Sequence, residues 1–98
     1  MAVSGIIRES LIDRSGTITL GGTAQALAPA NGNRSYFFIV NLSSGDLWIN
    51  FTSLAVLNQP SIRLQAGQSF VFEGAYITTE AISVIGATTG QAFTAKEA

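Results

Sequence analysis

Turn-forming residues recur along this chain at intervals of about eight to twelve residues, a spacing typical of a sandwich or barrel of short strands. Glycine, asparagine, serine and proline gather at 21–22, 29–33, 43–46, 58–60 and 66–68, and a further glycine-bounded turn is expected at 86–90. Glycine and asparagine tolerate the left-handed backbone that tight turns need, so each cluster predicts a reversal of the chain. The segments between the clusters are long enough only for short elements.

These segments have the residue patterns of strands. The segment 35–41 reads SYFFIVN, an aromatic and β-branched run that favours a strand. Because both of its faces are apolar, we expect either a central strand or a strand whose second face is covered by a neighbour. In 47–51, Leu47, Ile49 and Phe51 point one way by strand alternation. The eight predicted strands are 16–20, 23–27, 35–41, 47–51, 61–64, 69–73, 81–85 and 91–96.

Eight short antiparallel strands in two sheets predict an all-β fold, a jelly-roll-like antiparallel β-sandwich over residues 16–98. Residues 1–15 differ, because they hold four of the eleven charged side chains of the protein beside several large apolar ones. We predict that they form an N-terminal arm, which docks on a neighbouring subunit. The alternative is that this segment forms the first strand of the same sandwich. The arm residues expected to make contacts are Ile6, Ile7, Leu11 and Ile12.

The chain carries few charges for its size. Only 11% of its residues are charged and 47% are hydrophobic, whereas an ordinary soluble domain has roughly 25% charged residues. A small domain has a high surface-to-volume ratio, so uncharged polar residues or another protein must cover this surface. The composition therefore indicates an assembly component. The net charge of −1 gives no reason to expect nucleic acid as a partner, and no apolar run approaches the ~20 residues that span a bilayer, so no membrane partner is expected.

The residue types present do not favour catalysis. The chain has no histidine and no cysteine, so a serine nucleophile would lack its usual activating base and a metal its commonest ligands. A glycosidase would need a pair of carboxylates, but most acidic residues fall at expected turns or on polar strand faces, where solvation explains them. We predict no enzyme, no catalytic residue, no cofactor and no metal site. The acidic residues are Glu9, Asp13, Asp46, Glu73, Glu80 and Glu97.

Trp48 is the single residue with the most informative position. By strand alternation it lies on the face with Asp46 and Asn50, away from Leu47 and Ile49. Three interpretations stand. Trp48 belongs to a strand that is buried on both faces, it anchors an interface with a subunit or partner, or it stacks on a sugar ring beside the polar groups.

Three stretches, 21–51, 61–74 and 81–98, resemble a group of small virion-associated proteins of tailed bacteriophages. The likeness covers about two thirds of the chain, and its most distinctive parts are the phrases SSGDLWINF and ATTGQAFTAKE. The resemblance implies a jelly-roll-like sandwich of the kind that decorates or cements capsids, often as a trimer on the capsid lattice. It supplies no catalytic residues.

From this resemblance and the composition together, we expect a non-enzymatic virion structural protein, made in the host cytoplasm and located in the virion. Its expected partners are copies of itself, with a trimer favoured, and the major capsid protein or another virion protein. The expected contact residues are the four arm residues and Trp48. The alternative function is a carbohydrate- or receptor-binding module of a tail fibre or tailspike, with Trp48, Asp46 and Asn50 at its site.

Overall fold

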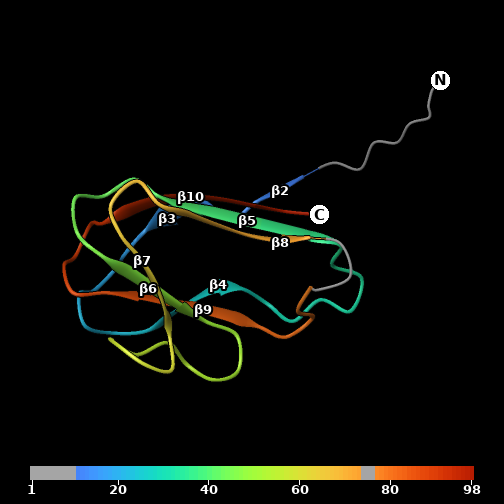
Figure 1. Ribbon diagram of the computed structural model, residues 1–98, viewed down its shortest axis with the longest axis horizontal. Coiled ribbons are helices and arrows are strands. Elements are labelled where there is room, and N and C mark those ends of the chain that lie inside the picture. The colour runs from blue at the N-terminus through green and yellow to red at the C-terminus, as the bar shows by residue number, and fades with distance from the viewer. Residues whose placement is uncertain (1–10, 74–76) are drawn as a thin grey trace.

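The computed structural model describes residues 11–73 and 77–98, and every regular element in these ranges is a β-strand. The strands form two antiparallel sheets that lie one above the other (Figure 1). The five-stranded sheet contains β2 (Ile12–Asp13), β3 (Gly16–Thr17), β5 (Tyr36–Asn41), β8 (Ser69–Glu73) and β10 (Ala92–Glu97). The four-stranded sheet contains β4 (Gln25–Ala28), β6 (Leu47–Asn50), β7 (Ile62–Leu64) and β9 (Ile82–Gly86).

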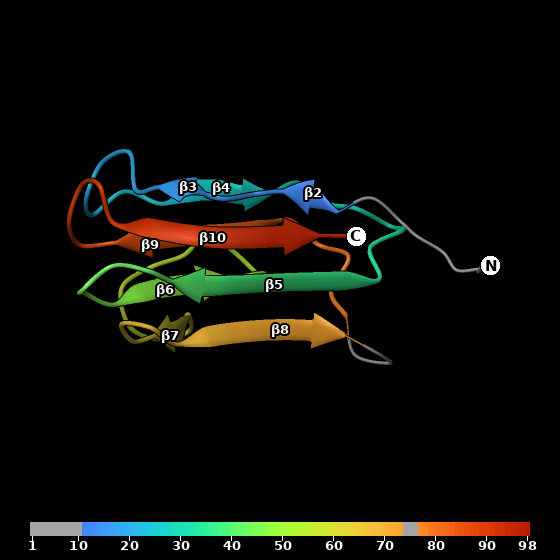
Figure 2. The same ribbon diagram turned by 90° about the horizontal axis from the view of Figure 1, so that it is seen from above.

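The order of the strands is that of a jelly roll. The five-stranded sheet runs β2-β10-β5-β8, with β3 also pairing β10, and the four-stranded sheet runs β4-β9-β6-β7. The strands β2 and β3 pair successive parts of β10, so together they act as one interrupted edge strand (Figure 2). Counted that way, there are eight strands, and consecutive strands lie in different sheets except β6 and β7, which are neighbours in the four-stranded sheet. The predicted jelly-roll-like antiparallel sandwich is confirmed, and each of the eight predicted segments contains a strand.

The core lies between the two sheets and follows strand alternation. Phe37 and Ile39 of β5 face Ile49 and Val84 from the other sheet, and all four are completely buried. The first expectation for 35–41 is correct, because β5 lies between β10 and β8. The buried residues of the hydrophobic core cluster are Ile18, Leu27, Ala28, Phe37, Ile39, Leu47, Ile49, Leu64, Ile82, Val84, Phe93 and Ala95.

The strand β9 departs from simple alternation, because all five of its residues are buried. The loop 51–61, which joins β6 to β7, crosses the side of the four-stranded sheet that faces away from the five-stranded sheet (Figure 1). In this loop Ala55 is buried, and its backbone N–H donates to the Ser83 Oγ at 3.0 Å. Ser83 would be solvent-facing in a bare sheet, so the loop forms a partial third layer.

Residues 12–13 of the predicted arm are part of the sandwich. Asp13 pairs with Lys96 and Ile12 with Glu97 in the register of β2 with β10. For these two residues the alternative interpretation, a first strand of the sandwich, therefore holds. Ile6 and Ile7 lie outside the described residues, so the arm itself stays a prediction.

Candidate interaction surface

The outer face of the five-stranded sheet is apolar around β5. Phe37, Ile39 and Asn41 point into the core, so Tyr36, Phe38 and Val40 point outward, and all three are only half-buried. Val71 of β8 pairs in register with Phe38 and is 40% exposed. We call the surface made by Tyr36, Phe38, Val40 and Val71 the β5 face.

A single sheet face that looks toward water normally carries polar side chains. The β5 face instead carries two aromatic and two β-branched residues, and its polar neighbours Thr94 and Lys96 lie on one side of it, on β10. A contiguous apolar surface rimmed by polar residues is the usual form of a protein-binding site. The second expectation for 35–41, a face covered by a neighbour, concerns this outward side of β5 and stays a prediction.

The base of the arm lies at one edge of the same sheet. Leu11 is 56% exposed, and Ile12, which pairs with Glu97 of β10, is 44% exposed. Two predicted contact residues are thus presented to solvent at the edge of the five-stranded sheet. The other two, Ile6 and Ile7, fall in the undescribed segment.

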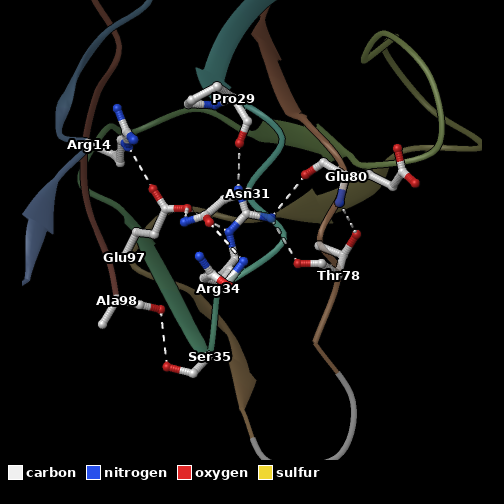
Figure 3. A network of polar contacts seen from close by, with 10 residues as sticks. Arg14, Pro29, Asn31, Arg34, Ser35, Thr78, Glu80, Glu97 and Ala98 are labelled. Atoms are coloured by element: carbon white, nitrogen blue, oxygen red, sulfur yellow. Dashed lines mark hydrogen bonds and ion pairs between the residues drawn. The ribbon is translucent and has the colours of Figure 1, made fainter. Parts of the chain in front are cut away.

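A buried ionic cluster fixes this edge (Figure 3). The Glu97 side chain is fully buried, and its Oε2 accepts from the Arg34 Nε at 2.7 Å while its Oε1 accepts from the Arg14 Nε at 2.8 Å. Asn31 donates to the same carboxylate at 3.3 Å. One carboxylate thus ties together the end of β10, the residue that follows β2 and the loop before β5.

Arg34 is the second centre of this cluster, and its side chain is also fully buried. Its Nη1 donates to the carbonyl oxygens of Thr78 and Glu80, and its Nη2 donates to that of Pro29, at 2.8 to 2.9 Å. The guanidinium therefore has an acceptor at each of its three nitrogens. A buried charge is tolerated when its hydrogen bonds are satisfied in this way.

These contacts decide the pKa of Glu97. Burial opposes ionisation and would raise the pKa of the Glu97 carboxyl, but the hydrogen bonds from Arg14, Arg34 and Asn31 outweigh burial and hold the pKa below its usual value. At the surface, hydrogen bonds from the Ser15 side chain and backbone and from Lys96 lower the pKa of Asp13 to about 2. Both carboxylates are therefore charged at neutral pH.

Sequence reasoning missed this cluster. Solvation is the sequence-based explanation for most acidic residues, with no separate interpretation of Glu97, whose side chain is buried. Alternation along 93–97 was the available signal, since Glu97 shares the inward face with Phe93 and Ala95.

Trp48 lies on the outer side of the four-stranded sheet, outside the core cluster, and is half-buried. In register it stands between Ile85 of β9 and Arg63 of β7, and the Arg63 guanidinium lies over its ring at 6.0 Å from the centroid. The two polar residues expected beside it are already engaged, because Asp46 accepts from the Arg63 Nε at 2.9 Å and Asn50 is buried against Thr52. A role for Trp48 at an interface or a sugar stays a prediction.

Within 11–73 and 77–98, no group of three or more histidine, cysteine, aspartate or glutamate residues is placed to hold a metal ion. In the same ranges, no helix has the length and apolar character that a membrane crossing requires.

Comparisons with known proteins add little. No protein-family model matches the chain, and no curated protein matches it. A solved structure of Bacillus endospore appendages, described as a family of disulfide-linked pili, is similar over 99% of this chain and 93% of its own chain. The sequence identity is 14% and the TM-score is 0.48.

Proposed function

We propose that this protein is a non-enzymatic structural subunit that acts by self-association and decorates a bacteriophage head. The β5 face is the observation that carries the proposal. Its four residues place aromatic and β-branched side chains on the outside of a sheet whose other side already forms the core. Covering such a face with a second protein removes apolar surface from water, which is favourable by roughly 25 cal/mol for each Å².

A closed homo-oligomer is the form of assembly that we propose, with a trimer favoured. Closed symmetry buries the same face on every subunit and prevents the assembly from growing without limit. The edge strand β8, which contributes Val71, would also be protected from further pairing in such an oligomer. The sparse charge of the whole chain, 11% of its residues, is consistent with a surface that is partly covered in use.

The capsid is the partner that we propose for this oligomer, and the proposal takes it from the likeness to small phage virion proteins. A decoration protein needs contact area and no chemistry, and binding only to the folded, assembled shell stabilises that shell by mass action. Neutral sheet surfaces suit this task better than charged ones, because repeated contacts in a shell are then insensitive to ionic strength.

Two measurements test the proposal. Light scattering of the purified chain should give the mass of three chains, and gold-labelled antibody should mark the head of intact phage particles in electron micrographs. A single-chain mass at every concentration would refute self-association. Label on the tail alone would refute head decoration and favour the alternative, a receptor-binding module, for which glycan binding lost in Trp48→Ala is the matching test.

A further inference from the structure

An open groove of about 390 Å³ lies beside the four-stranded sheet. One wall is the turn that follows β6, with Phe51 and Leu54, and Leu54 is 73% exposed. The opposite side is β4 with Pro29, and the start of β9 completes the lining. All of its lining residues belong to the described part of the chain.

The groove is apolar and carries one charged residue. Leu54 and Pro29 supply its exposed apolar surfaces, Phe51 is half-buried, and Glu80 is the single charged residue in its lining. Of the β4 residues in the lining, Ala26 and Ala28 bear short side chains, and the Gln25 side-chain amide is hydrogen-bonded to the backbone of Thr17 and Thr19. An apolar groove with one acidic group fits an apolar segment that carries a nearby cation.

This chain contains a segment of that kind. Residues 1–10 read MAVSGIIRES, in which Arg8 directly follows Ile6 and Ile7. The segment continues from Leu11 at the edge of the five-stranded sheet, and ten residues reach at most ~35 Å when extended. The proposed self-association brings the same segment of other copies to the surface of the molecule, so we take the arm of a neighbouring copy as the occupant.

We infer that Ile6 and Ile7 of one copy pack in the groove of a second copy, with Arg8 beside Glu80. The inference rests on the proposed self-association, and it names the place where the arm binds. The two isoleucines would cover Phe51 and Leu54, and the one charged residue of the groove would gain a partner of opposite sign.

Cysteine pairing tests the inference directly, because the natural chain has no cysteine. One full-length variant carries Ser4→Cys, which keeps both isoleucines, and a second carries Ala26→Cys at an exposed position in the groove lining. The matched control is Ala87→Cys, an exposed alanine in the turn after β9. On mild oxidation of mixtures, we expect the S4C–A26C two-chain product to form at least tenfold faster than the S4C–A87C product.

Equal rates for the two mixtures would overturn the inference. A chain carrying both Ser4→Cys and Ala26→Cys that closes only on itself at every dilution would also overturn it, since the arm would then occupy its own groove. Light scattering of the unmodified chain separates the two proposals. An oligomer without the preferred disulfide leaves self-association standing, and a monomer at every concentration removes both.

Charge reversal gives a second measurement. Glu80→Arg should weaken self-association several-fold, and adding Arg8→Glu to the same chain should restore it. The Glu80 backbone oxygen, which Arg34 uses, is kept in both variants. Loss of binding that the second substitution does not restore would contradict the placement of Arg8.

Discussion

At the scale of single residues, Glu97 lies at the centre of the buried ionic cluster, where its carboxylate accepts from Arg14, Arg34 and Asn31. Removing its charge by Glu97→Gln leaves the Arg34 guanidinium buried without its counter-ion, and breaking a buried ion pair in this way costs about 3 kcal/mol. We therefore expect the free energy of unfolding, measured by urea denaturation, to fall by about that amount. The matched control is Asp46→Asn, which breaks the exposed pair with Arg63 and should cost less than about 1 kcal/mol. Equal losses for the two variants would show that the cluster is not tightly buried.

The same carboxylates predict how stability depends on pH. The pKa of Glu97 in the folded protein lies below 4.5, and that of Asp13 falls from 3.8 to about 2. A lowered pKa means that the unfolded chain takes up the proton first as the pH falls. The stabilisation is therefore fully present above about pH 5 and is lost progressively toward pH 2. Denaturation at pH 6, 4 and 3 should show this loss, with a shallower dependence in Glu97→Gln. Parallel curves for the two proteins would contradict the assignment to Glu97.

The directions of some buried side chains could be predicted from the sequence, and that of Glu97 could not. The inward direction of Leu47 and Ile49 followed from alternation and is correct. The burial of Glu97 was not predicted, because an acidic residue is ordinarily solvated. Its burial is tolerated because of the ion pair with Arg34, which is 63 residues away in the chain. A sequence shows each charge but not its partner across the fold.

At the scale of elements, the positions of the strands were predictable, but the length of the first was not. The segment 16–20 holds only the two-residue strand β3, and Ile18, which follows it, enters the core. The complete burial of β9 was not predictable either. It depends on a loop of irregular structure, whose path no periodicity encodes.

The division of the arm from the sandwich leads to a deletion experiment. Deleting residues 1–10 keeps the pairing of β2 with β10 and the Arg14–Glu97 contact, so the free energy of unfolding should change by less than about 0.5 kcal/mol. Self-association should weaken at least about tenfold, because two isoleucines leave the interface. Deleting residues 1–15 removes Arg14 as well and should lower stability in addition. Urea denaturation and sedimentation equilibrium measure the two effects. Unchanged association in the shorter deletion would rule out an arm contact.

At the scale of the whole molecule, two sheets were expected, but their strand order was not specified. That order follows from which edges and faces fit together in three dimensions, and residues such as Arg34 and Glu97 that join distant segments take part in it. The apolar character of both faces of 35–41 was visible in the sequence. That its outward side forms one surface with Val71 required the register of β5 with β8.

The β5 face predicts the effect of a surface substitution. Val71→Lys places a charge in the proposed contact and should weaken self-association at least about tenfold, with little effect on folding because Val71 is 40% exposed on an edge strand. Leu20→Lys is the matched control, since Leu20 is 60% exposed and belongs neither to the β5 face nor to the lining of the groove. Sedimentation equilibrium of the two variants gives the comparison. Equal weakening by both would mean that the contact does not involve the β5 face.

The central claim is that copies of this chain associate through sheet surfaces that a lone subunit leaves open to water. Sedimentation velocity of the unmodified protein, from micromolar to millimolar concentration, tests it most directly. We expect one discrete oligomer, with the mass of three chains, that dissociates only on strong dilution. A single-chain sedimentation coefficient at every concentration would contradict the claim.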